Sequence, residues 1–141
     1  MLTNPTLKKL GFSPDDRVVI IHTDDIGMCQ ASVDAFADLW EFGLISSGAV
    51  MVPCPWFLEA AAYAHSHPNA DLGIHITLTS EWETYRWGPV STRDPVSGML
   101  DEQGFFYKKT EEVWAHADPS AAIAEMEAQV SRATAAGITP T

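Results

Sequence analysis

Two adjacent aspartates follow an apolar stretch near the start of the chain. The segment "VVIIHTDDIGM", residues 18–28, runs from four branched apolar residues into His22 and then into Asp24 and Asp25. Two ionised carboxylates side by side repel each other, and burial increases that repulsion. A bound divalent cation relieves this cost. We therefore consider Asp24 and Asp25 as candidates for a metal site.

A histidine farther along the chain could join this site. His75 lies in "DLGIHITLT", residues 71–79, and Glu81 follows. Ligands of parallel α/β folds bind at the C-terminal ends of strands, so Asp24, Asp25 and His75 could converge although about 50 residues separate them. Carboxylate and imidazole ligands suit zinc, with Mg, Mn, Co or Ni as alternatives. A second carboxylate could then act as the base that deprotonates a water molecule, as in metal-assisted hydrolysis.

Each of these residues also has a simpler explanation. The aspartates could form a turn and cap a helix, because "DDIG" precedes a helical pattern. His75 could be a hydrogen-bonded core histidine, and His22 could pack or orient the aspartates. The local sequence leaves these alternatives open.

The apolar pattern predicts alternating strands and helices. We expect strands over 17–23, 47–52 and 72–78, and helices over 29–42, 55–66 and 119–136. The first strand should be covered on both faces, as in a parallel sheet. In the last helix Asp118 should be the N-cap, and Ile123, Met126, Val130 and Ala133 should form the apolar face. Such alternation indicates an α/β fold with a parallel sheet.

The segment from Ser80 to about Glu112 has no clear period and predicts a long loop, with a hairpin at "GMLDEQGFFYK". Because this loop leaves the strand that carries His75, we expect Trp82, Arg86 and Trp87 to line a cleft beside the metal. Aromatic faces suit the C–H faces of sugars, and arginine donates several hydrogen bonds. Packing within the loop is the alternative role of these residues.

Composition limits the class of protein. The 141 residues suit one domain, and 46% of them are hydrophobic, which is enough for a core. The net charge of −11 argues against binding to nucleic acid or to an anionic membrane. The two cysteines do not form a disulfide scaffold, and no apolar run approaches a membrane span. The expected location is the cytoplasm.

The motifs "HTDDIGM", "VPCPWF" and "GIHITLTSEW", in this order, resemble the YdjC-like family of carbohydrate deacetylases over essentially the whole chain. The resemblance implies a distorted (β/α) barrel of the polysaccharide-deacetylase-like type. It also implies hydrolysis of a linear amide, the N-acetyl group of an amino sugar or oligosaccharide, with a divalent metal ion, Zn or Mg.

The same resemblance implies roles for three residues. Asp24 matches the general base, whereas Asp25 and His75 match metal ligands. In the family a third ligand histidine follows the segment that matches "GITPT", where this sequence stops. We therefore expect residues 1–141 to be a single, partial domain that is interrupted after about half of the barrel.

Other functions remain to be weighed. A receiver domain needs an acidic residue where the second strand ends, and "MVPCP" has none; a haloacid-dehalogenase-type phosphatase needs Asp-x-Asp. The serious alternative is a truncated, non-catalytic domain that binds metal or sugar or serves in assembly. Because a half barrel exposes strand edges and apolar faces, we also expect a homo-oligomer.

Overall fold

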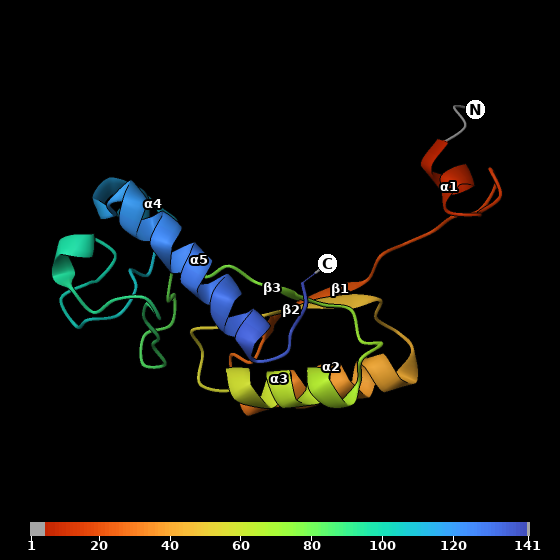
Figure 1. Cartoon of the computed structure of the whole chain (residues 1–141), viewed down its shortest axis with the longest axis horizontal. Helices are drawn as coiled ribbons and strands as arrows, with labels where there is room; N and C mark the ends of the chain where they lie inside the picture. The colour runs from red at the N-terminus through yellow and green to blue at the C-terminus, as the bar shows by residue number, and fades with distance from the viewer. Residues whose placement is uncertain (1–4, 141) are drawn as a thin grey trace.

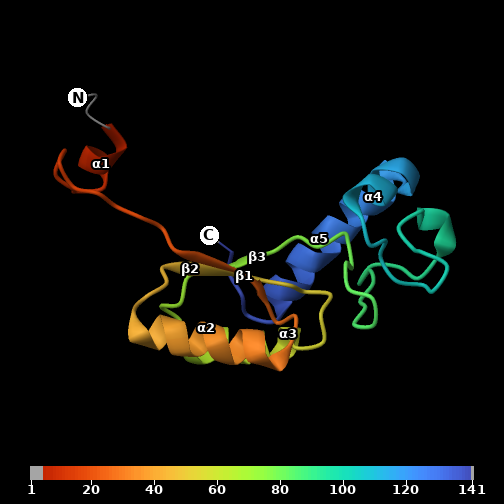
Figure 2. The same cartoon turned by 180° about the vertical axis from the view of Figure 1, so that it is seen from behind.

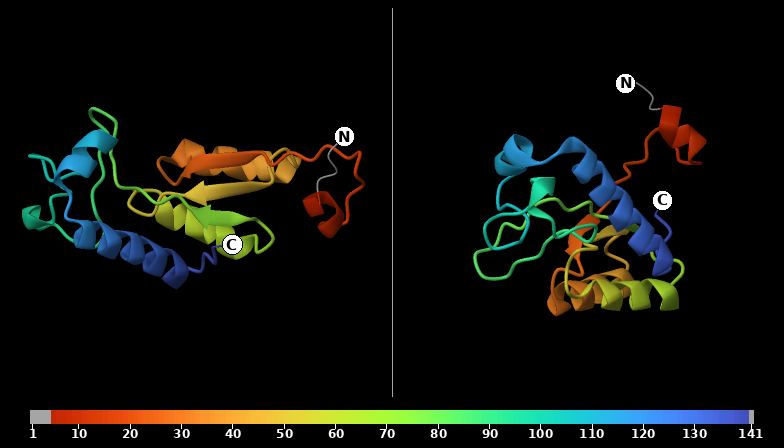
Figure 3. Two further views of the ribbon diagram at one scale, coloured as in Figure 1. Left: turned by 90° about the horizontal axis from the view of Figure 1, so that it is seen from above. Right: turned by 60° about the vertical axis from the view of Figure 1, so that its left-hand side comes forward.

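The computed structural model describes residues 5–140 and contains a three-stranded parallel sheet in the order β1-β2-β3 (Figure 1). Helices α2 and α3 lie together against one face of this sheet (Figure 2), and α5 lies alongside β3 (Figure 3). The elements are α1 (Pro5–Lys9), β1 (His22–Ile26), α2 (Gln30–Phe42), β2 (Ser47–Val50), α3 (Phe57–Ser66), β3 (Leu72–Ile74), the 3-10 helix η1 (Pro95–Ser97), α4 (Thr110–His116) and α5 (Pro119–Ala135). No helix in residues 5–140 is long and apolar enough to cross a membrane.

Two buried clusters hold these elements together. The larger cluster joins the sheet to α2 and α3 and includes Ile26, Phe36, Val50 and Phe57. The smaller cluster joins the end of β2 to the long segment before α4; its buried members are Met51, Cys54, Trp87, Met99 and Phe106. The long segment is therefore anchored by its own apolar residues beside the end of the sheet.

The α/β order and the parallel pairing predicted from the sequence are confirmed, and the bounds of α2, α3 and α5 agree to within two residues. Gly43 ends α2 in the left-handed conformation, and Asp118 caps α5 by accepting hydrogen bonds from the backbone of Ser120 and Ala121. The hairpin is present as an antiparallel bridge between Leu100 and Phe106. Helices α1 and α4 were not predicted.

The predicted first strand is wrong in its position. Strand β1 begins at His22, whereas the side chains of Val18–Ile21 are 39% to 76% exposed and the backbone there is extended but outside the strand. Only Ile21 reaches the sheet region, where its carbonyl accepts a hydrogen bond from the Ser46 N–H at 2.9 Å. The apolar run is therefore not covered on both faces within the described residues.

The predicted apolar face of α5 is wrong in part. Of its four members, Ala133 is buried and Met126 is half-buried, but Ile123 and Val130 are exposed. Glu125 and Gln129 are buried instead. The helix packs against backbone N–H and C=O groups of the neighbouring loops, so two polar side chains face inward to bind them. Within residues 5–140 the sheet has three strands, and the predicted barrel remains a prediction.

Candidate functional site

A β-bulge at the two aspartates shapes the candidate site. Thr23 pairs with Gly48 and Ile26 pairs with Val50, so two residues of β1 lie opposite one residue of β2. Asp25 occupies the bulge with φ of 61°, a left-handed conformation that aspartate tolerates better than most residues. Bulges of this kind redirect side chains and are common beside active sites. As a result Ile26 enters the core while both aspartates stay outside it.

The bulge brings Asp25 to His75, as the sequence predicted. His75 directly follows β3, and its Nδ1 lies 3.1 Å from Asp25 Oδ1. The contact has the distance of an ion pair but not the geometry of a hydrogen bond. His75 Nδ1 is buried and has no hydrogen-bond partner. A buried ring nitrogen without a partner is unfavourable, and a bound cation would satisfy it.

This pair has the chemistry and spacing of two ligands of one metal ion. Metal–nitrogen and metal–oxygen bonds of about 2.0–2.2 Å, at tetrahedral or octahedral angles, place neighbouring ligand atoms about 3.0–3.4 Å apart. The observed 3.1 Å falls in this range. Within residues 5–140, however, no group of three His, Cys, Asp or Glu side chains is arranged to hold a metal ion. A complete site therefore needs a further ligand from outside this range or from solvent.

Asp24 lies in a separate contact with His22. His22 Nε2 is 3.3 Å from Asp24 Oδ1, and His22 Nδ1 is 2.7 Å from the Ser47 hydroxyl on β2. If the Ser47 hydroxyl donates to Nδ1, then Nε2 carries the proton that faces Asp24. His22 thus connects Asp24 to β2, and the side chain of Asp24 remains exposed to solvent.

The alternative that the aspartates cap a helix is excluded for this structure. The N-cap of α2 is Cys29, and both aspartates belong to β1. The Ser32 hydroxyl holds the turn between them, since it accepts from the Gly27 N–H at 3.1 Å and donates to the Cys29 carbonyl at 2.8 Å. The aspartates are therefore free of the local role that could have explained them.

A cavity of about 350 Å³ opens at Asp25 and His75. Its wall also contains Glu81 and Trp82, two residues of the segment that follows β3. Trp82 is 55% exposed, and the Glu81 carboxylate accepts a hydrogen bond from the Thr79 hydroxyl. Sequence reasoning noted Glu81 but gave it no role; its position six residues after His75 was the available signal.

Negative charge converges on this cavity. Burial is the largest of the causes that raise the pKa of the Cys54 thiol to about 12, and the nearby charges of Asp25 and Glu81 contribute to the same shift. The negative charges of Asp25 and Glu81 are therefore both close enough to act on the Cys54 thiol, and both residues line the cavity. A negative potential of this kind favours a cation over an anion.

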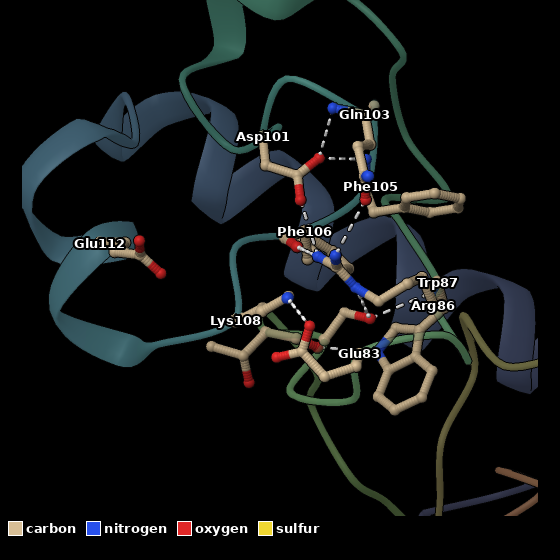
Figure 4. Close-up of polar contacts among 12 residues, drawn as sticks. Glu83, Arg86, Trp87, Asp101, Gln103, Phe105, Phe106, Lys108 and Glu112 are labelled. Carbon is tan, nitrogen blue, oxygen red and sulfur yellow. Dashed lines mark hydrogen bonds and ion pairs between the residues drawn. The ribbon is translucent and has the colours of Figure 1, made fainter.

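Arg86 and Trp87 do not line this cavity, unlike Trp82. Trp87 is 3% exposed in the smaller core cluster and donates through Nε1 to the Thr79 carbonyl at 2.7 Å. Arg86 points into the hairpin, where its Nη2 binds Asp101 at 2.8 Å and the Phe106 carbonyl at 2.6 Å (Figure 4). Both side chains hold the long segment together, which is the packing role that the sequence left open.

Comparison with known proteins places this arrangement in a family. The sequence profile described as YdjC-like protein matches residues 18–141. The chain belongs to the YdjC-like family. The matched region contains the bulge, His75 and the cavity wall, so the candidate site lies within the shared part of this YdjC-like chain.

Two relatives carry the name carbohydrate deacetylase. The one from Thermus thermophilus is 33% identical over 127 residues, which are 90% of this chain and 42% of the relative. The one from Thermoanaerobacter pseudethanolicus is 26% identical and covers 89% of this chain and 48% of its own length. A crystal structure from Enterococcus faecalis V583, described as a cellobiose-phosphate cleavage protein, has a TM-score of 0.74 and 27% identity, over 86% of this chain and 45% of its own. This YdjC-like chain thus spans less than half the length of these three proteins.

Proposed function

We propose that this chain supplies part of the active site of a metal-dependent hydrolase that removes N-acetyl groups from amino sugars or oligosaccharides. The observation that carries the proposal is the Asp25–His75 pair, 3.1 Å apart, with a buried imidazole nitrogen that has no hydrogen-bond partner. Family membership and relatives named carbohydrate deacetylase support the substrate class.

The residues divide into three roles. Asp25 and His75 would hold a divalent ion, zinc or magnesium, together with a ligand from outside residues 5–140. Such an ion, when bound, lowers the pKa of water and polarises an amide carbonyl. Asp24, held by His22, is the base that takes a proton from the attacking water. Trp82 offers an aromatic face for a sugar ring at the wall of the cavity.

A non-catalytic function is the second candidate. The described residues contain two of the expected ligands but not three, so the chain could bind metal or sugar weakly without turnover. Metal content and acetate release from an N-acetylated chitooligosaccharide, measured on residues 1–141 and on a chain extended to the length of the relatives, separate the two functions. Hydrolysis by neither chain would refute the deacetylase.

Two substitutions test the assigned roles. Asn tolerates the left-handed conformation as Asp does, so Asp25→Asn changes the charge and leaves the bulge intact. We expect Asp25→Asn to lower zinc content. We expect Asp24→Asn to leave zinc content unchanged and to lower acetate release by the extended chain by about 10²–10⁴-fold. Unchanged zinc content in Asp25→Asn would contradict the metal site, and unchanged turnover in Asp24→Asn would contradict the base.

Trp82 is tested on the same extended chain. Replacing Trp82 with alanine should raise the Michaelis constant for an amino-sugar oligomer, because the aromatic face at the cavity wall is lost. Trp114 is 91% exposed and does not line this cavity, so Trp114→Ala is the matched control. An unchanged Michaelis constant in Trp82→Ala would leave packing as the role of this side chain.

A further inference from the structure

Helix α5 presents two polar side chains to the interior. Glu125 and Gln129 are both 0% exposed and lie one turn apart on the same face of the helix. The carboxylate of Glu125 accepts the N–H of Val90 at 3.0 Å and the N–H of Ser91 at 2.8 Å. Burying such polar groups is costly unless their hydrogen bonds are made. The hydrogen bonds of Glu125 therefore fix the backbone at Val90 and Ser91 against α5.

Gln129 binds the backbone of Thr77 as a neighbouring strand would. Its Oε1 accepts from the Thr77 N–H at 3.0 Å, and its Nε2 donates to the Thr77 carbonyl at 2.7 Å. The same Nε2 lies 2.8 Å from Glu125 Oε1. Glu125 Oε1 accepts from the Val90 N–H as well as from Gln129 Nε2, so the amino end of the Gln129 amide faces Glu125.

Thr77 connects this network to the candidate site. Its hydroxyl donates to the carbonyl of His75 at 2.8 Å, and the His75 N–H donates to the Val50 carbonyl at 3.0 Å. Strand β3 ends at Ile74, so beyond that point Gln129 takes the place of a strand partner. The backbone of His75 is therefore held from both sides.

We propose that Gln129, oriented by Glu125, is a positioning residue that fixes Thr77 and thereby aims the imidazole of His75 at Asp25. The inference rests on the proposed function, because it gives His75 the role of a ligand. Residues that hold the ligands of a metal ion in place typically change its affinity by about 10–100-fold when they are replaced.

The test compares Gln129→Met with the wild-type chain. Methionine keeps the length of the side chain but makes neither hydrogen bond to Thr77. The exposed Glu127, on the same helix, gives the control Glu127→Gln. Two quantities are measured on folded protein: the Zn²⁺ dissociation constant, and the NMR order parameter of the His75 backbone amide.

We expect Gln129→Met to raise the Zn²⁺ dissociation constant about 10–100-fold and to lower the order parameter at His75, with Glu127→Gln unchanged in both. Equal order parameters in Gln129→Met and wild type would overturn the proposal. If the wild-type chain does not bind Zn²⁺, the metal site of the proposed function fails, and the order parameter still decides the positioning role.

A second variant covers the case in which Gln129→Met does not fold. Thr77→Val retains both backbone contacts with Gln129 and removes only the hydroxyl that binds the His75 carbonyl. A lower order parameter at His75 in this variant supports the connection between Thr77 and His75. An unchanged value overturns the connection and with it the proposal.

Discussion

The contact between Arg86 and Asp101 illustrates how single residues organise the long segment before α4. The side chain of Arg86 is 4% exposed, and Asp101 also accepts the N–H groups of Gln103 and Phe105 (Figure 4). Burial raises the pKa of the Asp101 carboxyl, but the Phe105 N–H, the guanidinium and the Gln103 N–H together outweigh burial. The pKa of Asp101 therefore lies below its ordinary value.

This lowered pKa predicts a pH-dependent contribution to stability. A carboxyl whose pKa is lower in the folded state stabilises it above the unfolded pKa of about 4 and loses that effect as the pH falls through the folded pKa. We expect Asp101→Asn to lower the free energy of unfolding by about 1.5–3 kcal/mol at pH 7 and by less at pH 3. Urea unfolding at both pH values measures the difference. A difference of equal size at both would contradict this explanation.

The contact between Asp25 and His75 could be predicted from the sequence, whereas the contact between Arg86 and Asp101 could not. Asp25 lies near the C-terminal end of β1, and His75 directly follows β3. Because parallel strands of one sheet end at a common edge, the approach of these two residues was predictable. Arg86 meets Asp101 only because the turn after Leu100 folds back onto Phe106. The hairpin itself was predicted, but nothing in the sequence indicates that Arg86 packs against it, so Arg86 was assigned to substrate instead of to Asp101.

Glycine at position 48 controls the packing between β1, β2 and α2. A Cβ atom there would lie within 3.0 Å of side-chain atoms of Ile26, Phe36 and Thr23. Ile26 and Phe36 are buried in the larger core cluster and have little room to move. Because Gly48 has no side chain, the bulged strand β1 can pack against α2 at this position.

Replacing this glycine should be costly, whereas its neighbour on β3 offers a control. We expect Gly48→Ala to lower the free energy of unfolding by about 1–3 kcal/mol through overpacking. A Cβ on Gly73 would meet only the Gly48 carbonyl, at 3.8 Å, so Gly73→Ala should change stability by less than about 0.5 kcal/mol. Thermal or urea unfolding of the two variants compares them directly. Equal losses would mean that strand flexibility and not packing determines the effect.

Helix limits were predictable because their signals are local. Gly43 ends α2 and Asp118 begins α5 in the conformations that these residue types favour. The buried face of α5 was not predictable, because Glu125 and Gln129 are buried by their bonds to backbone groups far away in the sequence. The predicted start of the first strand was wrong because Val18–Ile21 have strand-forming side chains but no neighbouring strand among the described residues.

At the scale of the whole molecule, the longest run of consecutive exposed apolar residues within residues 5–140 lies directly before β1. Val18, Val19, Ile20 and Ile21 are consecutive and exposed, and they precede a strand at the edge of the sheet. Exposed apolar patches and unpaired strand edges are typical sites of association. The net charge of −11 opposes close approach of two copies, so association should become stronger at high salt.

We expect residues 1–141 to self-associate through this segment, with a total buried area above about 1,000 Å². Ile20→Lys should weaken the association, because it places a charge in the apolar surface. Val96, a single exposed apolar residue on η1, gives the control Val96→Lys. Sedimentation velocity over a range of protein and salt concentrations measures the effect. A monomer at all concentrations would contradict the expected homo-oligomer.

The bulge in β1 has a consequence for insertions and deletions. Thr23 and Ile26 both contact the position of Gly48, although two residues separate them, so the sheet accommodates Asp24 and Asp25 in the space of one residue. A chain that lacks Asp25 would restore regular pairing and keep Thr23 and Ile26 on the same face. We expect such a deletion to fold with near-normal stability, measured by urea unfolding, but to lack the zinc binding proposed for Asp25 and His75. On this expectation, the bulge lets a second carboxylate be gained or lost here without changing the register of the core.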